Sequence, residues 1–194
     1  MKIFGYYQSI GTGDQPEEFA CANLWKTSWT HFGWEPVMLN RSHAQVSLKY
    51  NKVLQKLVGD LRHSEDLRPR FDWIVARFIR WCALHASGGG WMSDYDVINT
   101  GFTTESANKH TGTLSISAGP AYLFYVTPEH ALNVINKFLS EDITNGKLVY
   151  NECDILNTQP SSFEGVLHIK TSDGKKRSQL MQEQWNKLFT EDEK

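Results

Sequence analysis

Hydrophobic and polar residues follow one another along this chain in patterns that predict an ordered series of strands and helices. KIFGYY, residues 2–7, is a short apolar run typical of a strand. TGDQPEEF predicts the start of a helix that runs to about Phe32, because Pro16 stands at an early helical position with acidic residues beside it. GWEPVMLN predicts a second strand. This strand, helix and strand together predict an α/β domain with parallel strand pairing.

Two central segments have the spacing of helices. Apolar residues recur at intervals of three and four from Ser47 to Arg62, which predicts an amphipathic helix. Phe71 to Ala86 is apolar nearly all round, as a buried helix is. Ser87 and three glycines follow it and favour a helix C-terminus there.

The rest of the chain predicts shorter elements in a single domain. WMSDYDVI, TLSISA, AYLFYV and VLHI have strand character, and helices are predicted after Thr127-Pro128-Glu129 and from Ser178 to Phe189. A length of 194 residues suits one domain.

Composition and charge narrow the classes of function. With 40% hydrophobic and 22% charged residues the chain has an ordinary globular composition, and a net charge of −2 offers no basic face for nucleic acid. The N-terminus is too short and polar for a signal peptide, and no apolar run approaches the ~18 residues of a membrane span. The three cysteines, Cys21, Cys82 and Cys153, fit neither a zinc pattern nor a disulfide framework. Free thiols and a cytoplasmic location are predicted.

The candidate chemistry lies in GGGWMSDYDV. On an extended backbone, Asp94 and Asp96 point to one face and Tyr95 to the other. Two carboxylates so close repel unless a positive group lies between them, and Mg²⁺ and Mn²⁺ prefer such oxygen ligands. Arg77 and Arg80 share one face of the preceding helix. Two roles are open for each arginine. It pairs with an acid of the core, or it serves the site by orienting the aspartates or reaching a ligand.

The segment that contains the acid pair resembles a known protein family. RFIRWCALHASGGGWMSDYDV is similar to the sugar-binding region with a DXD motif of metal-dependent glycosyltransferases of the GT-A fold. Gly89-Gly90 and the Asp-Tyr-Asp-Val run fit the register of that pattern, while Arg80 lies one position further from Gly89 than the pattern expects. The resemblance implies a Rossmann-like α/β fold with a mixed central sheet flanked by helices. It also implies a nucleotide-binding part at about 1–100 and an acceptor and sugar part at about 101–194. It also implies Mn²⁺ or Mg²⁺ bound by Asp96, with Asp94 on the metal through water or on the ribose.

Two later stretches resemble the same family. YNECDILN is similar to the Asn-Asp-Gln-Asp-aliphatic-Leu-Asn motif of retaining enzymes, which implies that Glu152 and Asp154 are catalytic carboxylates facing the donor sugar. In VLHIKTSDGKKRSQ, the resemblance implies His168 as a third metal ligand and Lys175 or Lys176 as a diphosphate contact. The alternatives are a structural histidine and a solvated basic turn.

The first strand completes the expected site. FGYYQSIG resembles the family's first strand, which implies that Tyr6, Tyr7 and Gln8 stack on or hydrogen-bond to the base. The implied reaction moves a sugar from a nucleotide diphosphate, a UDP-sugar in the first instance, to an acceptor hydroxyl of a glycan or polysaccharide. Two alternatives stay open: a haloacid-dehalogenase-like phosphohydrolase, and a non-catalytic nucleotide-sugar or glycan-binding module, which Cys153 in place of a motif glutamine favours.

Overall fold

The computed structural model describes residues 1–8, 15–62, 71–110, 115–116, 122–140, 163–170 and 175–190 of the chain. Its strands are β1 (Lys2–Tyr6), β2 (Glu35–Leu39), β3 (Gly90–Ser93), β4 (Val97–Asn99), β5 (Ser115–Ile116), β6 (Leu123–Val126) and β7 (Val166–His168). Its helices are α1 (Gln15–His31), α2 (Arg41–Gln45), α3 (Tyr50–Arg62), α4 (Phe71–Ala86), α5 (Thr104–Asn108), α6 (Pro128–Ser140) and α8 (Arg177–Thr190).

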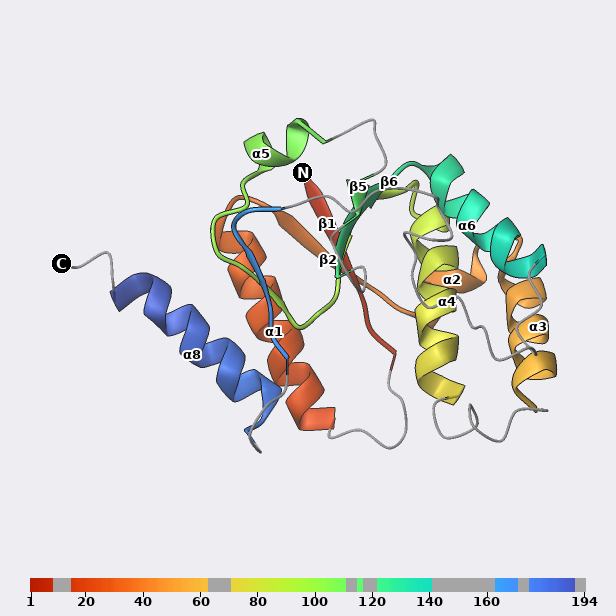
Figure 1. Ribbon diagram of the computed structural model, residues 1–194, viewed down its shortest axis with the longest axis horizontal. Helices are drawn as coiled ribbons and strands as arrows, with labels where there is room; N and C mark the ends of the chain where they lie inside the picture. The colour runs from red at the N-terminus through yellow and green to blue at the C-terminus, as the bar shows by residue number, and fades with distance from the viewer. Residues whose placement is uncertain are drawn as a thin grey trace.

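The central sheet is mixed. Its five strands have the order β2-β1-β3-β6-β5. β1 pairs in parallel with β2 and with β3, whereas β6 pairs antiparallel with β3 and with β5. Figure 1 shows α1 and α8 on one side of this sheet and α2, α3, α4 and α6 on the other. The predicted α/β class, the mixed sheet and the parallel pairing of the first strands are confirmed.

The two faces of the sheet carry separate hydrophobic cores, because successive side chains of a strand point to opposite faces. On β3, Trp91 packs in the cluster that contains Trp25 and Trp29 of α1. The next residue, Met92, packs in the cluster that contains most of the buried side chains of α4. Ser93 follows on the α1 side, where its Oγ accepts a hydrogen bond from Trp25 Nε1 at 2.7 Å. The last residue of β3 is therefore fixed from the α1 side just before the acidic pair begins.

α4 and the glycines after it set the starting point of β3. The helix is buried along most of its length, as its apolar sequence predicts. Gly88, Gly89 and Gly90 have φ values of +88°, +72° and +126°, a region that side chains disfavour. A Cβ added to Gly89 would lie 2.7 Å from the backbone nitrogen of Pro128. The predicted glycine stop is confirmed, and at Gly89 it is also a close approach to the start of α6.

Three boundaries differ from the sequence predictions. The helix predicted from Ser47 begins at Tyr50, because Asn40 caps the separate short helix α2 and the chain turns before α3 begins. WMSDYDVI holds two strands, β3 and β4, with a turn between them. A short helix, α5, capped by Thr103, lies between the segments WMSDYDVI and TLSISA, where no helix was predicted.

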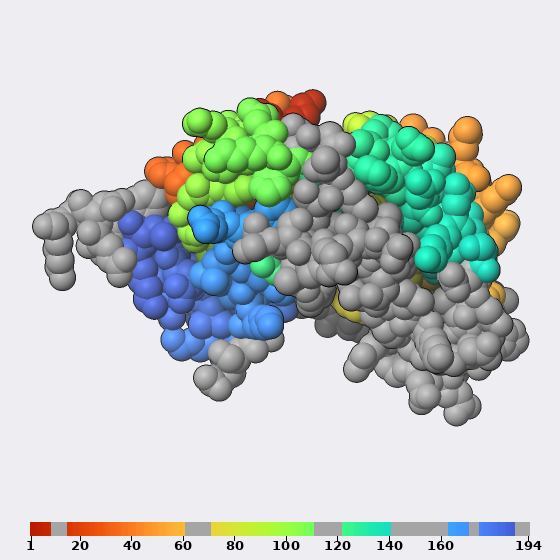
Figure 2. All heavy atoms as spheres, turned by 45° about the horizontal axis from the view of Figure 1, so that its top comes forward, coloured from red at the N-terminus to blue at the C-terminus, as the bar shows by residue number. Residues whose placement is uncertain are grey.

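A second, smaller sheet brings the end of the chain to the middle. β4 and β7 pair antiparallel, with Val97 opposite His168. Gly165 anchors this pairing, since its carbonyl oxygen accepts from the amides of Thr100 at 2.8 Å and Phe102 at 3.1 Å. Figure 2 shows the segment 163–170 lying against residues 101–110 on one face of the molecule. Among the described helices, none combines the length and apolar character needed to cross a bilayer.

Candidate metal centre

Asp94 and Asp96 lie on a tight turn that connects β3 to β4. The Asp94 amide donates to the carbonyl oxygen of Tyr122 at 2.9 Å, and the Val97 amide donates back to the carbonyl oxygen of Asp94 at 3.2 Å. The predicted extended backbone at this point is wrong, and so is the placement of Tyr95 on the opposite face, because Tyr95 lines the same pocket as both aspartates. The turn, rather than strand alternation, brings the carboxylates together.

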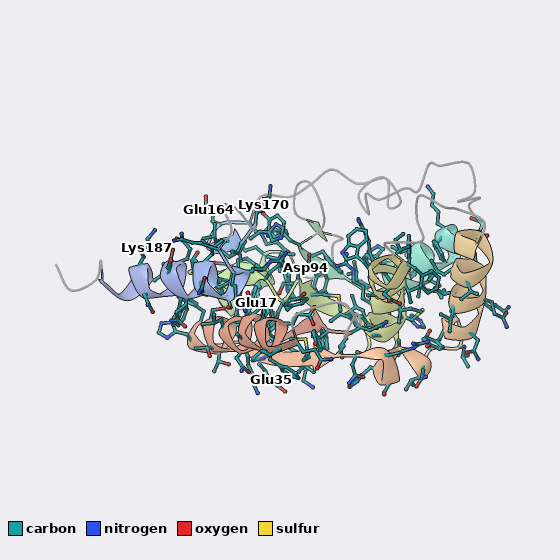
Figure 3. The ribbon with its side chains drawn as sticks, turned by 90° about the horizontal axis from the view of Figure 1, so that it is seen from below. Glu17, Glu35, Asp94, Glu164, Lys170 and Lys187 are labelled. Carbon is teal, nitrogen blue, oxygen red and sulfur yellow. The ribbon has the colours of Figure 1, made fainter. Side chains whose placement is uncertain are left out.

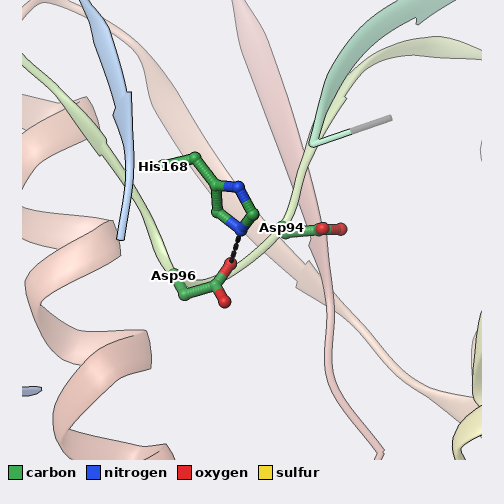
Figure 4. A group of neighbouring side chains, drawn as sticks. All are labelled: Asp94, Asp96 and His168. Carbon is green, nitrogen blue, oxygen red and sulfur yellow. Dashed lines mark ion pairs between the residues drawn. The ribbon is translucent and has the colours of Figure 1, made fainter. Parts of the chain in front are cut away.

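His168 joins the two aspartates through the second sheet. Pairing of β4 with β7 places it opposite Val97, and the amide of Ile169 donates to the carbonyl oxygen of Asp96 at 3.0 Å. Its Nε2 lies 3.6 Å from Asp96 Oδ1. One ligand atom from each of Asp94, Asp96 and His168 lies within 4.8 Å of the others (Figure 4). The three predicted metal ligands are therefore close enough to share one ion.

Each carboxylate also has an arginine partner. Arg80 Nη1 of α4 lies 2.8 Å from Asp94 Oδ1, and Arg177 Nη1 of α8 lies 2.9 Å from Asp96 Oδ2. The repulsion between neighbouring carboxylates falls when each has an opposite charge beside it. Of the alternatives left open for Arg80, the contact with Asp94 matches the one in which the arginine orients the aspartates rather than a separate core acid.

The donor set fits a divalent cation. Asp96 is 8% exposed, and its Oδ1 is buried without a hydrogen-bond partner among the described residues. A buried acceptor without a partner is costly, and a cation beside it removes that cost. Carboxylate oxygens suit both Mg²⁺ and Mn²⁺. The imidazole nitrogen favours Mn²⁺, a transition metal, over Mg²⁺.

These side chains line a pocket of about 340 Å³. It lies beyond the carboxyl ends of the parallel strands β1 and β3, where ligands bind in open α/β sheets. Figure 1 shows that α1, α4 and α8 all begin toward the end of the sheet where β1 finishes, which is at the bottom in that view. The other lining residues come from β1 and its extension, from α1 and α4 and from the β3–β4 turn: Tyr6, Gln8, Glu18, Trp73, Ala76, Arg77, Met92, Ser93 and Tyr95. Three arginines and three carboxylates thus face one cavity.

The pocket contains some of the other predicted site residues. Tyr6 donates its hydroxyl to Gln8 Oε1 at 2.9 Å, and both line the pocket. Burial raises the pKa of the Tyr6 hydroxyl above its ordinary value, so it stays a hydrogen-bond donor further into the alkaline range than a free tyrosine does. Arg77 also lines the pocket, with its guanidinium carbon 5.4 Å from the centre of the Trp73 ring.

Other predicted residues lie elsewhere. Tyr7 is not among the residues that line the pocket, and its hydroxyl donates to Glu18 Oε2 at 2.8 Å. Lys175 is also absent from the lining, and its Nζ lies 2.9 Å from Glu183 Oε1 in an exposed ion pair. The predicted catalytic residues Glu152 and Asp154 lie outside the described residues, as does Cys153.

Sequence reasoning missed Arg177, Glu18 and Trp73. Arg177 stands in the basic run at 175–177, where residue type alone does not separate it from its neighbours. Glu18 could have been found from its position in the first turn of the helix that follows β1, since that turn lies beside the carboxyl end of the strand. Trp73 occupies the corresponding first turn of α4 and is 45% exposed, unusual for a tryptophan.

No protein-family model matches the chain, and no curated protein matches it. The site and the sequence motifs are therefore the features that point to a function.

Proposed function

We propose that this chain is a metal-dependent glycosyltransferase that moves a sugar from a nucleotide diphosphate, a UDP-sugar in the first instance, to an acceptor hydroxyl of a glycan. The observation that carries the proposal is the group of Asp94, Asp96 and His168, whose ligand atoms lie within 4.8 Å of one another. Arginines beside this group and a pocket beyond the parallel strands support a phosphorylated ligand. The DXD-like motif supplies the sugar-transfer chemistry by resemblance.

The chemical difficulty of such a transfer is the leaving group, which gains negative charge as the bond to the sugar breaks. When bound, Mn²⁺ or Mg²⁺ supplies positive charge beside the diphosphate. Asp96 and His168 offer an oxygen and a nitrogen ligand for the ion, and Arg80 fixes the orientation of Asp94. Arg177 and Arg77 are positioned to donate to phosphate oxygens at the same pocket.

The remaining roles follow the geometry less directly. Tyr6 and Gln8 offer a hydroxyl and an amide at the end of β1, where we assign the base. Glu152 and Asp154 remain predicted to face the donor sugar, with retention of configuration, on the resemblance of their motif alone.

One observation favours the phosphohydrolase as a second candidate. Asp94 follows directly after β3, in which Trp91 and Met92 are each 1% exposed, so an acid does emerge from the end of a buried strand. A nucleophilic aspartate needs a reactive carboxylate, however, and the ion pair of Asp94 Oδ1 with Arg80 at 2.8 Å lowers the nucleophilicity of Asp94. His168 close to Asp96 adds a nitrogen ligand that oxygen-ligated Mg²⁺ does not need. The transferase accounts for both contacts.

The test is to incubate the protein with a panel of UDP- and GDP-sugars and Mn²⁺, and to assay nucleotide release, sugar transfer to added glycans and turnover of a generic phosphatase substrate. We expect metal-dependent nucleotide release that EDTA abolishes and that Asp96→Asn lowers by at least about 100-fold. Glu35→Gln is the matched control, because Glu35 is an exposed carboxylate at the opposite end of the strands, paired only loosely with Lys2 at 3.9 Å. Figure 3 shows Glu35 at the periphery and Asp94 near the middle of the molecule.

Each other outcome rejects the proposal in a different way. Phosphatase turnover that depends on Asp94, without nucleotide release, would identify the hydrolase. Thermal stabilisation by UDP and Mn²⁺ without turnover of any donor would identify a binding module. Equal loss in Asp96→Asn and Glu35→Gln would show that the activity does not arise from this pocket.

A further inference from the structure

Tyr122, the residue directly before β6, contacts both parts of the candidate metal centre. Its carbonyl oxygen accepts the hydrogen bond from the Asp94 amide at 2.9 Å. Its ring stacks on the imidazole of His168, with centroids 5.0 Å apart and planes 20° apart. Asp94 belongs to the turn after β3, and His168 ends β7. Tyr122 therefore joins two segments that are distant in the sequence at the point where their ligand atoms meet.

The stack bears on the orientation of the His168 ring. Strand pairing fixes the backbone of His168, but the side chain still rotates about its own bonds. Its Nε2 lies 3.6 Å from Asp96 Oδ1, which is too long for a hydrogen bond. The stack on Tyr122 restrains the imidazole further, because such ring pairs have a preferred geometry.

We propose that Tyr122 is a positioning residue of this centre: its carbonyl fixes the Asp94 backbone, and its ring aims His168 Nε2 at Asp96. The inference rests on the proposed metal-binding function. A ligand imidazole must present its nitrogen in the right direction, and loss of the groups that orient metal ligands typically weakens metal affinity by about 10–100-fold.

Two substitutions separate the ring from the rest of the residue. Tyr122→Leu removes the ring and keeps the backbone carbonyl, so the contact to Asp94 remains. Tyr122→Phe keeps the stacked ring and removes only the hydroxyl. Tyr125→Leu is the matched control, since Tyr125 lies on the same strand β6 and its ring packs against Trp91 at 5.4 Å, outside the metal-binding group.

The experiment measures the dissociation constant of Mn²⁺ from the electron paramagnetic resonance signal of the free ion. It also records the ring-proton signals of His168 in metal-free protein by NMR, assigned with His168→Gln. We expect Tyr122→Leu to weaken Mn²⁺ binding by about tenfold or more. It should also move the His168 signals downfield, because protons stacked over an aromatic ring are shielded. Tyr122→Phe should stay within about twofold of wild type, and Tyr125→Leu should change neither readout.

Two results overturn the inference while leaving the proposed function in place. In the first result, His168→Gln abolishes Mn²⁺ binding but Tyr122→Leu binds Mn²⁺ with wild-type affinity. The other is a His168 spectrum that Tyr122→Leu leaves unchanged. A wild-type protein that binds no Mn²⁺ at all overturns the proposed function, and the metal role of Tyr122 with it.

Discussion

Arg177 and Asp96 form an ion pair in the pocket, with Nη1 and Oδ2 2.9 Å apart, although one begins α8 and the other ends the turn after β3. With the pair of Arg80 and Asp94, it gives each carboxylate of the acidic turn a guanidinium of its own. The charge of this turn is thus balanced within the chain. A metal ion that approaches Asp96 therefore meets a positive group already in place.

Replacing Arg177 with glutamine should destabilise the protein. Asp96 is almost fully buried and would lose its charged partner, which costs about 1–2 kcal/mol after allowance for the partial exposure of Arg177. Urea denaturation measures the change. Lys175→Gln is the control, because its pair with Glu183 is about half exposed on both sides and should contribute less than about 0.5 kcal/mol. Equal stability of the two variants would contradict a structural role for the Arg177 pair.

The same Arg177→Gln variant should bind Mn²⁺ more tightly than wild type when no nucleotide is present. Removing one positive charge next to Asp96 lowers the repulsion of the incoming ion, and Coulomb's law gives roughly a tenfold gain at low ionic strength. Titration at two salt concentrations measures it, since salt should shrink the gain. If Arg177 instead held Asp96 in the binding geometry, Mn²⁺ affinity would fall.

Gly89→Ala should destabilise the protein far more than Gly88→Ala. Both glycines have positive φ, but a Cβ at Gly88 meets nothing within 4 Å, whereas a Cβ at Gly89 lies 2.7 Å from Val126 O and Pro128 N. We expect about 1 kcal/mol for Gly88→Ala and at least about 3 kcal/mol for Gly89→Ala. Denaturant midpoints at equal m-values measure the change in the free energy of unfolding. Similar losses of stability in the two variants would refute the close approach at Gly89.

Cys21 and Cys82 should resist thiol reagents in the native state. Both are free and buried. Burial raises the pKa of Cys21 to about 12 and that of Cys82 to about 11, and the nearby Glu17 carboxylate adds to the rise at Cys21. In a Cys153→Ser background at pH 8, we expect a disulfide reagent to react with these two thiols only after urea is added. Rapid reaction without urea would contradict their burial.

The raised pKa values also predict how stability depends on pH. A thiol that ionises at a higher pH in the folded chain contributes stability that is complete below its ordinary pKa and is lost as the pH rises through the folded value. Tyr95, whose pKa burial raises to about 12, acts in the same direction. The urea midpoint should therefore fall progressively from about pH 9 upward. Cys82→Ala should flatten part of that fall.

Trp73→Ala should weaken ligand binding with little loss of stability. The ring lines the pocket beside Arg77 and is 45% exposed, so it offers a flat surface to a bound ring at small structural cost. Stacking of a base on an aromatic ring is worth about 1–3 kcal/mol, which predicts about a tenfold loss of UDP affinity in the presence of Mn²⁺. Calorimetry measures it. Phe19→Ala is the control, because Phe19 is 59% exposed and is not among the pocket residues.

The features that the sequence predicted well are local ones. The apolar helix Phe71–Ala86 and its glycine stop both depend on residues within a few positions of one another. The three-residue spacing of Arg77 and Arg80 likewise predicted one shared face, and both line the pocket. His168 was predicted as a ligand only with the help of a family resemblance, and β7 pairing with β4 is what brings it beside Asp96.

The features that could not be predicted depend on contacts between distant segments. Which basic residue of 175–177 reaches the acids is decided by where α8 begins. Glu17 of α1 accepts the amide and hydroxyl of Ser178, each at 2.6 Å, and this fixes the first turn of α8 with Arg177 toward Asp96. No pattern within the basic run contains that information. The turn at Asp94–Asp96 escaped prediction for the same reason, since a carbonyl of Tyr122 helps to form it.

The late position of β7 and α8 in the chain has a consequence for synthesis on the ribosome. The acidic turn and the helices around it emerge first, while His168 and Arg177 follow much later. Until then Asp96 lacks both of these neighbours, and the nascent chain carries an exposed acidic turn where the finished pocket will be. Closure of β7 onto β4 would therefore be a late step of folding, and the pocket would become competent for ligands only when that step is complete.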